Sequence, residues 1–183
     1  MRRKVAWGVT GSGDKIGDTL GVIEKVREDH RDIEIEVFLS RSGETVLKYY
    51  RLLDRLKDGF EKVQVERNSN SPFLAGRLQL GEFDFLLIAP ATSNTVAKIA
   101  HGIADTLISN SAAMALKAMI PVYVMPTDFT EGTVVSKLPN GRDLRLKVRR
   151  EDAQNVEKLA KMDDLHLLER PEEIIQIFDK YYR

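Results

Sequence analysis

The chain has 183 residues, enough to bury a substantial core, and we expect one domain spanning 1–183. Its 28 Lys and Arg residues balance its 28 Asp and Glu residues, so no net field favours nucleic acid or an anionic membrane as a partner. The absence of cysteine excludes disulfides, thiolate metal sites and cysteine-held iron–sulfur clusters, and we expect no metal. No stretch resembles a cleavable signal or a membrane span, so we expect a cytoplasmic protein.

The first 125 residues alternate apolar strands with amphipathic helices. The predicted strands lie at 5–9, 33–39, 63–65, 85–89 and 122–125. The predicted helices lie at 15–28, 44–56, 93–100 and 111–118, with another that ends near residue 80. Because parallel strands need crossover connections, this alternation predicts an α/β fold with a doubly wound parallel sheet.

The C-terminal part, 126–183, departs from this alternation. Asn140 and Gly141 favour left-handed turn conformations, and they predict a β-hairpin between strands at 134–138 and 144–148. The elements predicted after the hairpin are a helix at 151–161, a strand at 166–168 and a helix at 171–181. We therefore expect a binding core at 1–125 and a C-terminal extension of hairpin and helices.

Ligands of open parallel sheets bind at the carboxyl ends of the strands, where three polar turns are expected. The first turn holds Gly11, Ser12 and Gly13 before a helix, where backbone N–H groups and the helix dipole favour a phosphate. Gly17 follows one residue too late for the dinucleotide fingerprint, and Ser40 ends the second strand in place of an acid. A mononucleotide with a terminal phosphate is therefore the favoured ligand.

The second turn offers the hydroxyls of Ser40 and Ser42 and the guanidinium of Arg41 to the same phosphate. The third begins where Pro90 interrupts the hydrogen bonding of its strand, and short polar side chains then start a helix. Asn94 carries a donor and an acceptor for a ligand edge, and it is the one candidate for a role in the reaction. The residues expected to line the site from this turn are Pro90, Ala91, Thr92, Ser93, Asn94 and Thr95.

Each of these turns also has a purely structural explanation as a tight connection, a solvated loop or a capped helix. Trp7 is expected in the core, because parallel strands are buried on both faces. Structural or surface roles are expected for the three histidines, His30, His101 and His166. Further residues expected near the ligand are Ser109, Asn110, Met125 and Asp128.

The motif at 90–95 is followed by Gly102-Ile103-Ala104-Asp105. Together with the 11–13 turn and Ser40, it makes the first 125 residues resemble the homo-oligomeric flavin-containing cysteine decarboxylase family. The resemblance implies a flavodoxin-like, Rossmann-like fold, FMN as cofactor, and homotrimers or larger assemblies with flavin at the subunit contacts. It places the phosphate and ribityl chain at 11–13 and Ser40, and the isoalloxazine ring near 92–95.

Two departures from the decarboxylases change the expected chemistry. Those enzymes carry a histidine before the helix that precedes the central motif, and residues 68–80 contain none. Their substrate clamp after the fifth strand contains an asparagine, whereas this chain has Asp128, which repels a carboxylate. The chain instead resembles the archaeal branch of the family, the archaeoflavoproteins and dihydromethanopterin reductases, in which the flavin itself is the reactive group.

This resemblance implies an FMN-dependent oxidoreductase that transfers electrons from a ferredoxin-like donor to a protein or pterin acceptor. A ferredoxin is acidic, so a basic hairpin surface is its candidate docking site, although a solvated hairpin explains the same residues. The cations concerned are Arg142, Arg145, Lys147, Arg149 and Arg150. Two alternatives stay open: a flavin-dependent decarboxylase or prenyltransferase of the same family, and a non-catalytic flavin-binding oligomeric module.

Overall fold

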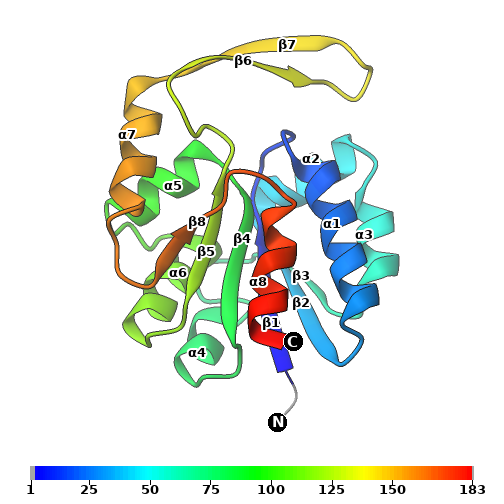
Figure 1. The fold of residues 1–183 in the computed structure, drawn as a ribbon, viewed down its shortest axis with the longest axis vertical. Coiled ribbons are helices and arrows are strands. Elements are labelled where there is room, and N and C mark those ends of the chain that lie inside the picture. Colours follow the sequence, from blue (N-terminus) through cyan, green and yellow to red (C-terminus); the bar gives the residue numbers. More distant parts are fainter. Residues whose placement is uncertain (1–2, 183) are drawn as a thin grey trace.

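The computed structural model describes residues 3–182, which form a six-stranded parallel sheet with helices on both faces (Figure 1). The strand order is β3-β2-β1-β4-β5-β8. These strands are β1 (Arg3–Val9), β2 (Ile33–Leu39), β3 (Val63–Val65), β4 (Phe85–Ala91), β5 (Val122–Pro126) and β8 (Leu165–Leu167). The expected doubly wound α/β fold is confirmed.

Two apolar clusters, one on each face of the sheet, hold the helices in place. One cluster packs beneath α1 (Ile16–Asp29), α2 (Arg41–Tyr49), α3 (Leu53–Gly59) and α8 (Glu173–Tyr182). The other packs beneath α4 (Leu74–Gln79), α5 (Ser93–Ala100), α6 (Leu107–Lys117) and α7 (Arg150–Leu159). No helix within residues 3–182 combines the length and apolar character needed to cross a membrane.

The direction of chain crossover reverses between β1 and β4. The chain moves from β1 outward through β2 to β3, and it returns to the other side of β1 for β4, β5 and β8. Loops that leave neighbouring strands at such a reversal diverge to opposite faces, and this opens a crevice at the carboxyl edge. Trp7 is fully buried in β1 as expected, and its Nε1 donates a hydrogen bond of 2.7 Å to the carbonyl of Ala89 in β4.

The prediction of one continuous helix at 44–56 is wrong, because the structure has two helices, α2 and α3, in this region. Arg51 adopts a left-handed conformation with φ of 57°. The N–H of Leu52 then donates to the carbonyl of Leu47 at 2.9 Å, and the N–H of Arg51 donates to the carbonyl of Lys48 at 3.0 Å. This is a Schellman-type helix end, and it could not be predicted because the left-handed position is occupied by arginine in place of the usual glycine or asparagine.

Two boundaries in the central motif also differ from prediction. The strand predicted at 85–89 continues to Ala91, and Pro90 lies within β4 where its pairing with β5 shifts register between Ile88 and Ala91. Such irregularities are where a sheet accepts proline. The helix predicted at 111–118 starts earlier, at Leu107, because Thr106 and Ser109 form a capping box.

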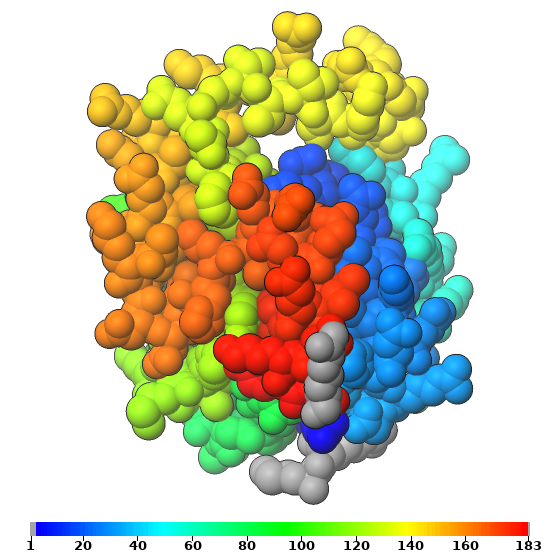
Figure 2. Space-filling model, in the orientation of Figure 1, coloured from blue at the N-terminus to red at the C-terminus, as the bar shows by residue number. Residues whose placement is uncertain are grey.

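The predicted hairpin is confirmed as β6 (Gly132–Lys137) and β7 (Asp143–Val148), which form a separate two-stranded sheet. The hairpin extends across the top of the molecule in Figure 1, over the carboxyl edge of the large sheet. In the space-filling view a gap opens between the hairpin, in yellow, and the blue segment that follows β1 (Figure 2). The hairpin thus lies over the strand ends, with open space beneath it.

Candidate functional site

Thr10 joins the carboxyl ends of β1 and β4 at the reversal point. Its Oγ1 donates to the carbonyl of Pro90 at 2.8 Å and accepts from the N–H of Thr92 at 2.9 Å. The side chain is buried, with 2% of its surface exposed, so both hydrogen bonds are shielded from water. Thr10 begins the predicted first turn but was not among the residues predicted to bind the ligand, and the structure shows that it fixes the first turn relative to the third.

The first turn lies so close to α2 and its C-cap that packing requires glycine at Gly11, and a side chain at Gly13 would have to displace the ring of Tyr50. A Cβ on Gly11 would lie 2.5 Å from the Cβ of Ser42, and one on Gly13 would lie 2.3 Å from the hydroxyl of Tyr50. The sequence-based reason for these glycines was close approach to an anion, and the structure adds contact with α2 as a second reason. Ser12 lies between them, half-buried, in the same turn.

Tyr50 connects this turn to the hairpin. Its ring is the neighbour that a side chain at Gly13 would meet, and its hydroxyl donates to the carbonyl of Lys137 in β6 at 3.1 Å. The tip of the hairpin is therefore held over the first turn from α2.

The second turn caps α2. Ser40 is the N-cap, and its Oγ accepts a hydrogen bond of 2.9 Å from the N–H of Gly43. Gly43 itself lies against the end of β1, because a Cβ there would be 2.5 Å from the carbonyl of Val9. Ser42 is exposed beside Gly11. Ser42 thus lies next to the first turn, while the hydroxyl of Ser40 caps α2.

The third turn caps α5. The Oγ1 of Thr92 accepts from the N–H of Thr95 at 3.3 Å, and the two hydroxyls lie 3.1 Å apart. Ser93 donates its hydroxyl to Asp128, which follows β5. Asn94, in the first turn of α5, is exposed, and its N–H has no partner within the helix. Pro90 and Ala91 are buried and contribute backbone only.

The four remaining residues that were predicted near the ligand differ in burial and in hydrogen-bond partners. Ser109 is 1% exposed, and its hydroxyl pairs with Thr106 in the cap of α6. Asn110 donates to Ser69 and Asn70 on the loop after β3. Met125 is fully buried, whereas Asp128 is half-buried at the same edge as the three turns.

Glu66 is a residue of this edge that the sequence did not single out. Its Oε1 accepts from the N–H of Leu107 at 2.8 Å, and its Oε2 accepts from the N–H of Arg41 at 3.2 Å. One carboxylate therefore caps both α2 and α6, whose dipoles favour a negative charge at this position. An acidic residue just after a short strand is too common to have predicted this arrangement.

Two carboxyl groups and a lysine surround the start of α1. Lys15, with φ of 60°, extends Nζ to the carbonyls of Pro126 at 3.3 Å and Glu169 at 2.9 Å. Burial raises the pKa of Asp14, and the negative charge of Asp128 raises it further, against the opposing effect of Lys15. Asp14 and Asp128 thus lie close enough at this edge for their charges to interact.

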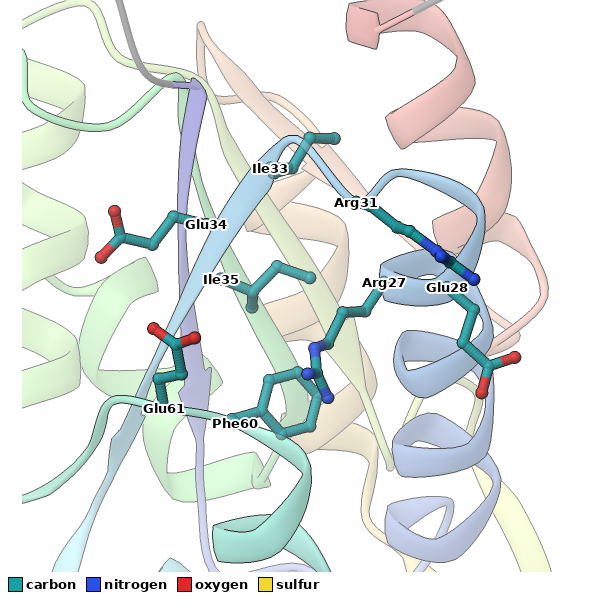
Figure 3. Close-up of a pocket in the computed structure, with 8 residues that line it drawn as sticks. All are labelled: Arg27, Glu28, Arg31, Ile33, Glu34, Ile35, Phe60 and Glu61. Atoms are coloured by element: carbon teal, nitrogen blue, oxygen red, sulfur yellow. The ribbon is translucent and has the colours of Figure 1, made fainter.

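A recess of about 460 Å³ lies at the opposite edge of the sheet (Figure 3). It lies between Arg27 and Arg31 near the end of α1, Ile33 at the start of β2, and Phe60 before β3. Open parallel sheets bind ligands at the other edge, and the Arg27 guanidinium already bonds the carbonyl of Gly59. We therefore assign the functional site to the three turns, not to this recess.

Comparison with known proteins gives one family for this chain. An uncharacterized protein of Methanocaldococcus jannaschii is 44% identical over 97% of this chain and 95% of its own length. A dihydromethanopterin reductase (acceptor) of Methanosarcina mazei is 36% identical over 77% of this chain and 61% of its own length. The crystal structure of Burkholderia xenovorans DmrB in complex with FMN, described as a cubic protein cage for redox transfer, has a TM-score of 0.82 and 32% identity. That match covers 98% of this chain and 95% of DmrB. The family described as Flavoprotein matches residues 1–180, and the chain therefore belongs to the Flavoprotein family.

Proposed function

We propose that this flavoprotein binds FMN at the three turns and transfers electrons from a ferredoxin-like donor to a pterin or protein acceptor. Support for FMN comes from DmrB, whose structure contains it, and from the family match. Support for a redox role comes from DmrB and from the dihydromethanopterin reductase of M. mazei. When bound, FMN supplies the redox chemistry, because it accepts and releases electrons, while the protein binds and orients it.

The residues present fit a phosphorylated flavin. Hydroxyls of Ser12, Ser40 and Ser42 lie around the first two turns, where α1 and α2 also start. We assign the phosphate and ribityl chain to these residues and to the backbone of Gly11 and Gly13, since helix starts offer N–H donors to anions. The isoalloxazine ring then lies near 92–95, where Asn94 offers a donor and an acceptor to its polar edge.

The observation that carries this proposal is the pair of hydrogen bonds from Thr10 to the carbonyl of Pro90 and from the N–H of Thr92 to Thr10. They fix the first and third turns relative to each other at the reversal point of the sheet. A ligand that spans both turns needs that fixed separation, and FMN has a phosphate at one end and a planar ring at the other.

We assign the docking site of the electron donor to the outer face of the hairpin. Arg145 and Lys147 are two residues apart in β7, so their side chains lie on the same face. Arg149 pairs instead with Asp152, so it contributes less free charge. The opposite face carries Val134, Leu144 and Leu146, and it continues into Val148, which is 1% exposed and packs against the body of the protein. The basic face therefore points to solvent, where an acidic donor can approach.

We also propose that the protein is a homo-oligomer of three or more copies. Large apolar side chains are exposed at both ends of α4 and just after α6, where Phe73, Leu80 and Met119 are 61%, 74% and 78% exposed. Exposed apolar side chains of this size support contact with another protein surface. The neighbouring DmrB forms a cubic cage. Light scattering on the purified protein tests this, and a monomer at all concentrations contradicts it.

The donor proposal is tested by stopped-flow reduction of the FMN-loaded protein with reduced ferredoxin under anaerobic conditions. The rate is expected to fall with ionic strength, and Arg145→Glu with Lys147→Glu is expected to lower it at low salt. Lys25→Glu with Lys57→Glu, at exposed positions of α1 and α3, is the matched control, because it makes the same change in net charge. A rate that is insensitive to salt and to both hairpin substitutions contradicts donor docking on this face. Failure of any donor to reduce the bound flavin favours the non-catalytic module.

A decarboxylase is disfavoured by the placement of the histidines. His30 and His101 are the C-caps of α1 and α5, so they lie at the far ends of the helices that start at the candidate site. His166 lies within β8 and stacks on Tyr123. No histidine among residues 3–182 therefore lies on the three turns.

A further inference from the structure

Asp128 occupies a central position at the carboxyl edge. Its Oδ2 accepts a hydrogen bond from the hydroxyl of Ser93, the first residue of α5. Its charge also acts on Asp14, which follows β1, and on Arg149, which precedes α7. Asp128 itself follows β5, so segments from four parts of the fold converge on one half-buried carboxylate.

The charge of Asp128 is not neutralised by a direct partner. Within residues 3–182 no Lys or Arg forms an ion pair with it, and its Oδ1 accepts no hydrogen bond from the protein. Arg149, the nearby cation, directs Nε and Nη2 to Asp152 at 2.9 and 2.7 Å. Lys15 directs its Nζ to two backbone carbonyls instead. A half-buried carboxylate with free acceptor capacity favours a ligand that donates hydrogen bonds to it.

Ser93 holds this carboxylate next to the turn to which the ring of the flavin is assigned. Asn94 is the next residue, and Thr92 precedes it. A planar acceptor that stacks on a flavin ring at this turn can therefore present one of its edges to Asp128. Because a carboxylate accepts hydrogen bonds and donates none, the most complementary edge has two adjacent N–H donors.

We propose that Asp128 selects the acceptor by accepting paired N–H donors, as on the 2-amino-4-oxopyrimidine edge of a pterin. This inference rests on the proposed function, which it deepens by naming the recognition group. N3–H and the 2-amino group of a pterin are adjacent donors, and each oxygen of a carboxylate has two acceptor sites, so Ser93 does not exhaust Oδ2. An acceptor that presents a carboxylate instead meets Asp128 and Asp14 and is repelled.

A pair of probes and one substitution test this assignment. The probes are 6-methyl-7,8-dihydropterin and its 2-oxo counterpart, 6-methyl-7,8-dihydrolumazine, which replaces the amino donor with a carbonyl acceptor. Binding of each to the oxidised, FMN-loaded protein is measured by titration calorimetry, so the readout does not depend on turnover. Asp128→Asn converts two acceptors into one acceptor and one donor, which complements the lumazine edge.

The protein is expected to bind the pterin at least about tenfold more tightly than the lumazine, since one charge-assisted hydrogen bond is gained and an acceptor–acceptor repulsion is avoided. Asp128→Asn is expected to remove or reverse this preference while FMN binding is retained. Glu131→Gln, an equal change of charge at an exposed position in the following loop, is expected to keep it. Equal binding of the two probes by the unsubstituted protein, or an unchanged preference in Asp128→Asn, overturns the inference.

The outcomes separate this inference from the proposed function. A protein that discriminates between the probes through Asp128 but never reduces the pterin retains the recognition role and loses the proposed acceptor. A protein that reduces the pterin with the same preference after Asp128→Asn retains the function and loses the recognition role. Ser93→Ala provides a second variant: it frees Asp128 without changing its charge, and it is expected to weaken pterin binding less than Asp128→Asn does.

Discussion

The carbonyl oxygen of Pro90 accepts hydrogen bonds from both the N–H and the hydroxyl of Thr10, at 3.3 and 2.8 Å. The same hydroxyl oxygen accepts from the N–H of Thr92. The carboxyl ends of β1 and β4 are therefore joined by one side chain at the position where the two loops diverge.

Thr10→Val is expected to destabilise the protein by about 1 to 3 kcal/mol, because it keeps the side-chain shape but leaves the N–H of Thr92 without its acceptor. It is also expected to weaken FMN binding, since the two turns lose their fixed separation. Urea unfolding and an FMN titration measure the two effects. Thr133→Val, at an exposed hairpin position, is the control. Unchanged stability and FMN affinity in Thr10→Val would show that this contact does not organise the site.

Glu66→Gln is expected to lower the free energy of unfolding by about 1.5 kcal/mol, because the amide offers one acceptor oxygen where the carboxylate offers two to Arg41 and Leu107. Its negative charge at the starts of α2 and α6 is lost as well. Chemical denaturation provides the measurement, with the exposed Glu61→Gln as the control. Equal stabilities of the two variants would contradict the double cap.

Arg77→Met tests the buried ion pair in which Arg77 donates Nη1 and Nη2 to Glu36 at 2.7 and 2.8 Å. Glu36 is fully buried, so loss of its main partner is expected to lower the free energy of unfolding by about 3 kcal/mol. This is the lower end of the range for breaking a buried ion pair, because Lys4 and Lys62 still pair with Glu36. Glu36→Gln combined with Arg77→Met is expected to recover part of this loss, since no unpaired buried charge is left. A double variant less stable than Arg77→Met would contradict this explanation.

The same pair gives the protein a dependence on acid pH. Burial opposes ionisation of Glu36, but hydrogen bonds and charges from Arg77 and Lys62 outweigh it, and they hold the pKa of Glu36 below its usual value. Its contribution to stability is therefore present above the pKa of an unfolded glutamate and is lost as pH falls through the lowered value. Unfolding measured as a function of pH should show a smaller loss at acid pH in the double variant than in the unsubstituted protein.

Asp14→Asn is expected to stabilise the protein at neutral pH. Burial and the charge of Asp128 raise the pKa of Asp14, so the folded state binds its proton more tightly than the unfolded state does. Stability from this group therefore falls as pH rises from the unfolded pKa to the raised folded value, and the cost persists at neutral pH. Thermal unfolding at several pH values measures it, and a melting temperature lowered by Asp14→Asn at neutral pH would contradict the sign.

The architecture was predictable because the spacing of apolar residues along the sequence indicates which faces of helices and strands are buried. Strands such as 33–39 and 122–125 are apolar runs with a helix on each side in the sequence, and alternation of this kind allows few sheet topologies. The three turns were predictable for the same reason, since each directly follows a strand of one parallel sheet. Their adjacency follows from β2, β1 and β4 being neighbours in that sheet.

The parts that were missed depend on tertiary contacts. Nothing in the local sequence marks Arg51 as a left-handed residue, because its conformation is fixed by the bonds that close α2. Glu66 and Thr10 are ordinary residues until the fold brings distant N–H groups to them. Gly11 and Gly13 stand out in the sequence, but their contacts with Ser42 and Tyr50 are a property of the packing.

The most direct test of the central claim is titration of the cofactor-free protein with FMN and with riboflavin, followed by flavin fluorescence. The three turns are expected to bind one FMN per chain, and at least roughly tenfold more tightly than riboflavin, because charge-assisted hydrogen bonds to the phosphate are lost without it. Equal affinity for the two flavins, or binding of neither, would contradict the assignment of a phosphorylated flavin to this edge of the sheet.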